Sequence, residues 1–451
     1  MIQFNDDVSI AGDSLDSREK TRMNPTKPAS QELSRLLLGF LIVLMLPACE
    51  ARREASEENA GEPWAALREL GDRLHEAAEV GENSSAAGSD RENADGGRYL
   101  AEILLARAGH EIFADPDYPA FRPQYPESAH VGLVNPDNLY ETARIRPGVE
   151  YLVRGTRGTT ADLVFQVYEG SPGVKGSLKS ISTLSADNLQ LDDHARFEIH
   201  VGPTPRKGNW LDSGETGGLL LVRWSHSDWA TERPGRTEIV RVGAEGQPRP
   251  NPDVTDIAQR IRSAGAAVPD AGQFWLDFVD RIRLFSGDND VMAPRETGDQ
   301  GLAGQVSSMG RWHLEDDEAL VLTLPRANAR YQGVQLGNFW FDALEWTDRQ
   351  TSLSGGQARL GSDGRYHYVI SARDPGVPNW LDTTGLPEGL FFIRFQGLAG
   401  EIAEADHPEA QRVKTSEIRQ HLPPDTPAID AKARRAQLAE RQIQIQRRYG
   451  R

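Results

Sequence analysis

Two stretches of the sequence follow the same plan, and together they decide the fold. The first is ARFEIHVGPTPRKGNWLDSGETGGLLLVRW, residues 195–224, and the second is GRYHYVISARDPGVPNWLDTTGLPEGLFFIRF, residues 364–395. Each contains a strand pattern, a polar turn, the tetrapeptide Asn-Trp-Leu-Asp, a Gly-rich turn and an apolar strand that leads to an Arg. The tetrapeptides begin at Asn209 and Asn379, 170 positions apart. Because the flanking pattern is repeated as well, we interpret the two stretches as related β modules.

The rest of the chain surrounds these modules with helices. Alternating apolar residues with Pro-Gly and Gly-rich turns, as in ETARIRPGVEYLVRGTRG (141–158), indicate antiparallel strands. Apolar residues at helical spacing occur at 64–79, 98–112, 252–284 and 426–448, with a break predicted at 82–97. The sequence therefore predicts a mainly β fold with flanking helices: two tandem antiparallel β-sandwich-like modules, an N-terminal helical cap, a helical linker and a C-terminal helix.

The predicted boundaries follow from these patterns. They are a signal segment at 1–48 (or from an alternative start at Met23), a flexible tether at 49–63, a helical N-terminal region at 64–128, the first β module at 129–248, a helical linker at 249–290, the second β module at 291–422 and a basic C-terminal helix at 423–451.

The apolar run at 36–48 ends beside the single cysteine of the chain. It is shorter than the roughly 20 apolar residues that span a bilayer, and its length is typical of the apolar region of a secretory signal. Leu46-Pro47-Ala48-Cys49 resembles the lipobox of bacterial lipoproteins, which implies cleavage before Cys49 and lipid attachment to its sulfur. Glu50 in the next position favours the outer membrane, facing the periplasm. The alternative is an ordinary signal peptide with a chance cysteine.

Composition excludes several classes of function. With one cysteine, the folded part has neither disulfides nor a thiolate metal site. A formal net charge of −17 disfavours nucleic acid and anionic lipid surfaces, so the lipid on Cys49 is the predicted membrane contact. The sequence contains no G-x-S-x-G, H-E-x-x-H or Gly-rich phosphate motif. It therefore predicts no cofactor and no metal site.

Several segments resemble the domain-of-unknown-function family 1214. They are NPDNLYETARIRPGVEYLVRGTRGT (135–159), VQLGNFW (334–340), WTDRQTSLSGGQARL (346–360), RDPGVPNWLDTTG (373–385), EGLFFIRF (388–395) and the N-terminal RYLAEILLARAGHEIFADPDYPAF (98–121). The resemblance extends over nearly the whole chain after the signal segment. It implies a β-sandwich-rich fold and leaves the activity open.

A polar loop in the second module is the first candidate for a binding site. The loop TDRQTSLSGGQ (347–357) has no obvious counterpart in the first module and is dense in hydrogen-bonding groups. The second candidate is VNPDNLY (134–140). In both cases the alternative is a hydrogen-bonded turn. The candidate ligand-binding residues are Asn338, Trp340, Asp348, Arg349, Gln350, Ser352, Gln357, Asp374, Asp137 and Asn138.

The repeated residues are interpreted as structural. Trp210 and Trp380 could be stacking platforms, but a duplicated fold has to keep its corners, which favours a role in packing. An Arg at the end of a strand could bind a carboxylate or phosphate, and the alternative is an ion pair with the Asp of the tetrapeptide. The structural repeat set is Asn209, Trp210, Asp212, Arg223, Asn379, Trp380, Asp382 and Arg394.

Three functions remain open. The first is an envelope-anchored lipoprotein that binds a small molecule or glycan through the polar loop of the second module. The second is an envelope hydrolase or lyase with an acid/base pair in the cleft between the modules, for which a buried carboxylate with a raised pKa would be evidence. The third is a structural or assembly partner that uses the basic C-terminal helix.

Overall fold

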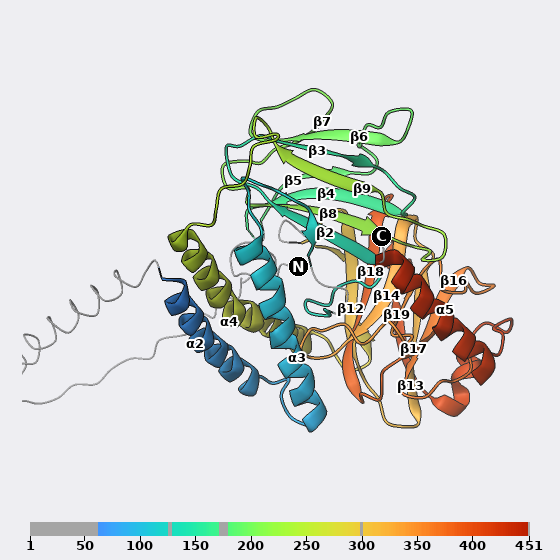
Figure 1. Ribbon diagram of the computed structural model, residues 1–451. Coiled ribbons are helices and arrows are strands. Elements are labelled where there is room, and N and C mark those ends of the chain that lie inside the picture. Colours follow the sequence, from blue (N-terminus) through green and yellow to red (C-terminus); the bar gives the residue numbers. More distant parts are fainter. Residues whose placement is uncertain (1–61, 125–128, 171–178, 298–300, 450–451) are drawn as a thin grey trace, which may run out of the picture.

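The computed structural model describes residues 62–124, 129–170, 179–297 and 301–449 (Figure 1). The chain forms two β modules, with N-terminal helices and a long linker helix on one side and a C-terminal helix along the second module (Figure 1). The signal segment, Cys49 and the predicted tether up to residue 61 lie outside the described residues.

The first module consists of two sheets. One has the strand order β1-β2-β8-β4-β5 and the other β7-β6-β3-β9. Its strands are β1 (Arg122–Pro123), β2 (Asn138–Arg144), β3 (Tyr151–Thr156), β4 (Asp162–Tyr168), β5 (Ser180–Ser185), β6 (Arg196–Val201), β7 (Asn209–Leu211), β8 (Leu219–Ser225) and β9 (Arg236–Arg241). Alternate residues of both sheets, such as Phe165, Ile199 and Trp224, are buried between them.

The second module repeats this topology. Its sheets have the orders β10-β12-β18-β14-β15 and β17-β16-β13-β19, and β11 also pairs with β12. The strands are β10 (Asp290–Val291), β11 (Arg295–Glu296), β12 (Gln305–His313), β13 (Glu318–Pro325), β14 (Ala329–Gly337), β15 (Ser352–Ser354), β16 (Arg365–Ser371), β17 (Trp380–Asp382), β18 (Glu388–Leu398) and β19 (Glu409–Lys414). Strands β2 to β9 thus correspond one to one with β12 to β19, and the two modules are duplicates.

The helices cover the modules from outside. The described helices are α2 (Pro63–Glu82), α3 (Asp90–Arg107), the π-helical turn η1 (Ala108–Phe113), α4 (Val254–Phe285), the 3-10 turns η2 (Glu404–Asp406) and η3 (Thr415–His421), and α5 (Ala431–Tyr449). None of the helices in the described part of the chain has both the length and the apolar character needed to cross a bilayer.

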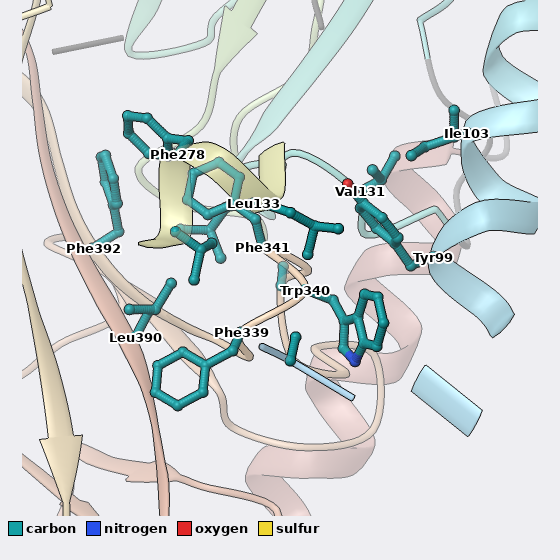
Figure 2. Close-up of a cluster of buried hydrophobic side chains, with 14 of the residues drawn as sticks. Tyr99, Ile103, Val131, Leu133, Phe278, Phe339, Trp340, Phe341, Leu390 and Phe392 are labelled. Atoms are coloured by element: carbon teal, nitrogen blue, oxygen red, sulfur yellow. The ribbon is translucent and has the colours of Figure 1, made fainter. Parts of the chain in front are cut away.

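An aromatic core joins the helices to the second module. Figure 2 shows Tyr99 of α3 and Phe278 of α4 together with the loop residues Phe339, Trp340 and Phe341. Trp340 lies against Gly96, where an added Cβ would come within 2.4 Å of its ring. This glycine therefore permits the close approach of α3 to the second module.

Each module binds the segment that precedes the first long strand of the other. Leu133 lies just before β2, yet its carbonyl accepts hydrogen bonds from Arg394 (2.8 Å) and Gln335 (3.3 Å) of the second module. Ala303 lies just before β12, and its carbonyl accepts a hydrogen bond of 3.0 Å from Arg223 of the first module. This reciprocal exchange ties the two modules together through backbone carbonyls, of which that of Leu133 is buried and that of Ala303 partly buried.

Two helix boundaries differ from the predicted ones. Helix α3 begins at Asp90 instead of residue 98, because Ser89 and Glu92 form a capping box inside the segment predicted as a break. Helix α5 begins at Ala431 instead of residue 426. The Asp430 side chain accepts a hydrogen bond from the amide of Ala433, and Pro427 lies before the helix, outside any helix or strand.

Candidate functional site

The Asn-Trp-Leu-Asp corner of the first module is held by side-chain hydrogen bonds to the backbone. Asn209 accepts from the amide of Gln190 (2.8 Å) and donates to the carbonyls of Gln190 (2.8 Å) and Glu198 (3.0 Å). The indole of Trp210 donates to the carbonyl of Gly202 (3.1 Å). These bonds attach the loop before β6 and the short strand β7 to the sheet.

The corner of the second module makes the same bonds. Asn379 accepts from the amide of Arg359 (2.8 Å) and donates to the carbonyls of Arg359 (2.8 Å) and His367 (3.1 Å). Trp380 donates to the carbonyl of Ser371 (3.0 Å). The side chains of both corners are therefore engaged in holding the fold.

The expected ion pairs between strand-end arginines and corner aspartates are not made among the described residues. Arg223 lies 3.8 Å from Asp162, and Asp382 pairs with Arg349 at 3.0 Å. The carboxylate of Asp212 accepts a hydrogen bond from the amide of Gly214. The arginines are instead used for the exchange between modules described above, a relationship that strand pattern alone does not indicate.

The outer face of sheet β7-β6-β3-β9 contains an open groove, which we call the module-1 groove. Its volume is about 770 Å³. Strand alternation places two rows of side chains on its floor: Glu198, Arg154 and Glu238 are in register, and Arg196 and Arg236 flank Thr156 in the next row. The groove is polar and charged.

Side chains in the module-1 groove differ in how their charges are balanced. Arg154 pairs with Glu198 at 3.0 Å, and Arg196 pairs with Asp192 at 2.8 Å. Hydrogen bonds from the backbone amides of Arg196 and His194, together with the Arg196 guanidinium, lower the pKa of Asp192 to about 2. Lys207 and Arg236 have no acidic partner within 4.0 Å among the described residues. The module-1 groove thus has two cations available for a ligand.

The equivalent place in the second module is filled by the chain itself. There, residues 422–426 lie over Arg359, His367 and Asn379, which correspond to Gln190, Glu198 and Asn209 of the first module. The space that remains is about 20 Å³, roughly the room for one water molecule.

A few side-chain differences explain why one face is covered and the other is open. In the first module, Leu152 is paired with His200 on the neighbouring strand. At the equivalent positions of the second module, Val321 is paired with Val369. Lys207 precedes the first tetrapeptide by two positions, and Val377 precedes the second by two. Val321, Val369 and Val377 form an apolar cluster with Ile418 and Leu422. Leu152 matches Val321, but His200 and Lys207 replace Val369 and Val377, which weakens that driving force in the first module.

The polar loop at 347–357 contacts the protein with several of its predicted site residues. Gln350 donates to the carbonyls of Pro378 (3.1 Å) and Trp380. Ser352 is fully buried and receives two hydrogen bonds from Arg441 of α5, of 2.7 and 3.2 Å. Arg349 is half exposed and pairs with Asp382.

The remaining predicted residues of the second module lie in separate surroundings. Asp348 is exposed, and Gln357 accepts a hydrogen bond from the amide of Ser354. Asn338 caps its own turn by accepting from the amides of Trp340 and Asp342, and it donates to Asp95 at 3.5 Å.

Trp340 is buried, and its indole donates to the carbonyl of Glu92. Asp374 pairs with Arg434 of α5 at 2.9 Å. These side chains do not converge on one cavity among the described residues.

Asp137 of the second predicted segment lies at the centre of a buried network between the modules. Its carboxylate accepts hydrogen bonds from Tyr331 (2.7 Å) and Trp229 (2.8 Å). Burial raises the pKa of Asp137, while the Tyr331 hydrogen bond and the guanidinium groups of Arg448 and Arg441 oppose the rise. The neighbouring Asn138 donates to Tyr140 at 2.8 Å.

A second buried carboxylate lies between α3 and the second module. Asp342 is 3% exposed, and its Oδ1 atom has no hydrogen-bond partner among the described residues. Burial, followed by the negative charge of Glu102, raises the pKa of Asp342 well above its usual range. Glu102 accepts hydrogen bonds from Arg98 (2.7 Å) and from the amides of His130 (2.5 Å) and Val131 (3.0 Å).

The residues of the module-1 groove and of the Asp342 cluster were not predicted. A comparison of the two repeat copies, position by position, contains a signal for the groove, since His200 and Lys207 stand where Val369 and Val377 stand in the second copy. No such signal exists for Asp342, because its surroundings include Glu102 of the distant helix α3.

Comparison with solved structures shows the same fold in another bacterial protein. An uncharacterized protein from Burkholderia cenocepacia is 29% identical, with a TM-score of 0.72, and the match covers 78% of this chain and 97% of that chain. A protein from Vibrio parahaemolyticus is 13% identical, with a TM-score of 0.40, over 70% of this chain and 98% of that chain. No family model and no curated protein matches the chain. The chain is thus similar to an uncharacterized bacterial protein, and membership of family 1214 stays a prediction.

Proposed function

We propose that this protein is a lipid-anchored envelope protein of family 1214 that binds a ligand in the module-1 groove. The lipobox-like sequence ending at Cys49 supports the anchor, with the outer membrane, facing the periplasm, as the proposed location. The duplicated β body supports a binding role, because a rigid sheet holds the groove residues in fixed positions. Small molecules, glycans and peptides are the ligand classes to be compared.

One observation carries the binding proposal. The two modules have equivalent outer faces, and the second uses this face to hold residues 422–426, whereas the first leaves about 770 Å³ open. The fold therefore contains an occupied example of the same binding position. The polar loop at 347–357 is the weaker candidate, because Gln350 and Ser352 are already bonded to the protein.

A thermal-shift screen with small anions, oligosaccharides and peptides tests the proposal. The groove variant is Lys207→Glu/Arg236→Glu, and the matched control is Lys432→Glu/Arg435→Glu, which makes the same charge change on the exposed face of α5. We expect a ligand that raises the melting temperature of the wild type and the control but not of the groove variant. A ligand that stabilises all three proteins equally would place the site elsewhere.

The buried carboxyl of Asp342 favours a second candidate function, acid/base catalysis by an envelope hydrolase or lyase. Burial, followed by the negative charge of Glu102, raises the pKa of the Asp342 carboxyl, and a carboxyl with a raised pKa is suited to act as a general acid. Arg98 and Glu345, whose side chains are 44% and 36% exposed, lie at the solvent side of this cluster. Turnover of a chromogenic ester or glycoside that is lost in Asp342→Asn and kept in the exposed-site variant Asp348→Asn would support this candidate.

A further inference from the structure

The second module shows what kind of ligand its outer face accepts. Residues 422–426 are a short piece of polypeptide, Leu-Pro-Pro-Asp-Thr, with one apolar anchor and one acidic contact. Leu422 joins the apolar cluster that contains Trp380. Asp425 lies 3.6 Å from Arg359 and accepts a hydrogen bond of 2.7 Å from Ser362. The segment connects η3 to the chain leading into α5, so it is held at both ends.

We propose that the module-1 groove binds an acidic, proline-containing peptide segment of another protein, in the place where the second module holds its own residues 422–426. This inference rests on the proposed function and names the class of its ligand. An extended segment with proline loses little conformational entropy on binding, which suits a shallow groove on a sheet face.

The shape of the groove favours a peptide over a glycan. A sugar ring would be expected to stack on an exposed aromatic face. Among the described residues, Phe197 is the one Phe, Tyr or Trp that lines the groove, and it is only 4% exposed because it points into the module core. The floor instead presents guanidinium, carboxylate and hydroxyl groups of Arg154, Glu198 and Thr156, which can bond to peptide carbonyl, amide and carboxylate groups.

The charge of the groove favours an acidic segment. The two glutamates of the floor flank Arg154, and Asp192 is paired with Arg196. Lys207 and Arg236 are the groove cations without an acidic partner within 4.0 Å among the described residues. They correspond in role to Arg359 of the second module, which faces Asp425.

Polar floor residues make the binding reversible. The apolar residues that cover the outer face of the second module are replaced by His200 and Lys207, so the empty module-1 groove is stable in water. A bound segment would be held mainly by charge and hydrogen bonds, and its affinity would fall with ionic strength.

The test is a selection of displayed random 12-residue peptides on the full mature protein, run beside a glycan array. We expect the selected peptides to be enriched in Asp, Glu and Pro. Their affinity should fall roughly tenfold or more in Lys207→Glu/Arg236→Glu, since two surface ion pairs are lost and repulsion is gained. The Lys432→Glu/Arg435→Glu control should bind as the wild type does. Equal melting temperatures of the three proteins exclude misfolding as the cause.

Each other outcome has a separate meaning. Selection on the groove variant, in which two cations are replaced by glutamates, should enrich basic peptides. If basic peptides are not enriched, the proposed contact between the peptide and Lys207 and Arg236 is wrong. Glycans that bind in a groove-dependent manner, with no peptide selected, would overturn the peptide inference and leave the proposed function standing. If neither peptides nor glycans bind, both the peptide inference and the proposed function are wrong. Peptides that bind the groove variant as tightly as the wild type would place their site elsewhere.

Discussion

The hydroxyl of Tyr331 donates a hydrogen bond of 2.7 Å to the buried carboxylate of Asp137, and the two residues belong to different modules. Asp137 lies at the start of the first module and Tyr331 on β14 of the second. Both side chains are almost completely buried, so this bond is made in a medium of low polarity. It is therefore a direct physical link between the two copies of the duplicated fold.

Removing the Tyr331 hydroxyl should destabilise the protein. Tyr331→Phe leaves the Asp137 carboxylate with one donor fewer, which should lower the free energy of unfolding by about 1–3 kcal/mol. Urea denaturation measures the change. The control is Tyr118→Phe, whose hydroxyl bonds to the carbonyl of Pro248 at an exposed position and should matter little. Equal effects of the two substitutions would contradict a special role for the Asp137 link.

Asp342 should make the stability of the protein depend on pH. Its pKa is raised in the folded state, and in the unfolded chain it is about 3.9. The stability that the Asp342 carboxyl contributes to the fold is therefore fully present below about pH 4 and is lost as the pH rises through the pKa of the folded state. From pH 4 to pH 8, the free energy of unfolding of the wild type should therefore fall relative to that of Asp342→Asn. A difference that stays constant over this range would show that Asp342 is not protonated in the fold.

The two arginines that lie over the Trp229 ring should respond differently to replacement by methionine. Arg441 donates to the carbonyl of Trp346 and to Ser352, whereas the guanidinium nitrogens of Arg448 have no hydrogen-bond partner among the described residues. Arg441→Met should cost about 2–4 kcal/mol, because buried acceptors lose their donor. Arg448→Met should be close to neutral or stabilising. Chemical denaturation of both variants decides this, and a larger loss for Arg448→Met would contradict it.

The two corner asparagines should contribute equally to stability. Asn209→Ala and Asn379→Ala each remove three hydrogen bonds to the backbone and should each cost about 1–3 kcal/mol. The sites share no partner, so the double variant should show the sum of the two losses. Strongly unequal or non-additive losses in urea denaturation would mean that the corners are not equivalent.

The anchor has its own prediction. If the proposed lipid anchor exists, Cys49→Ser should release the protein from membranes into the soluble fraction of the envelope, because the variant lacks the sulfur to which the lipid would be attached. Fractionation followed by immunoblotting measures the distribution. Pelleting of the variant with the membranes as in the wild type would mean that something other than this thiol attaches the protein.

Much of the fold could be predicted because it depends on local pattern. Alternating residues in 195–201 and 365–371, the repeated tetrapeptides and the helical spacing of 252–284 are visible without any knowledge of distant contacts. The helix starts at Asp90 and Ala431 were misplaced, since they depend on single capping side chains that a hydrophobic pattern does not contain. Helix α5 was predicted as an element, but not its insertion of Arg441 between Trp229 and Ser352.

The candidate site was much harder to predict. The loop at 347–357 is rich in polar groups, which from sequence indicates binding, yet Ser352 and Gln350 bond to segments far along the chain. Conversely, Lys207 and Arg236 lie in ordinary charged stretches and line the same groove only because β7, which follows Lys207, and β9 are the two edge strands of one sheet. Whether a polar residue is free or already bonded depends on its neighbours in space.

By itself, the sequence determined that this protein is a duplicated sheet structure with helices around it, since strand alternation and turn residues act over a few neighbours. Only the tertiary structure decided that the outer face of one copy is filled by residues 422–426 and that of the other is open. The reason is physical: burial and pairing of charges are set by contacts between residues that are distant in the chain, and the pattern within one stretch does not identify those contacts.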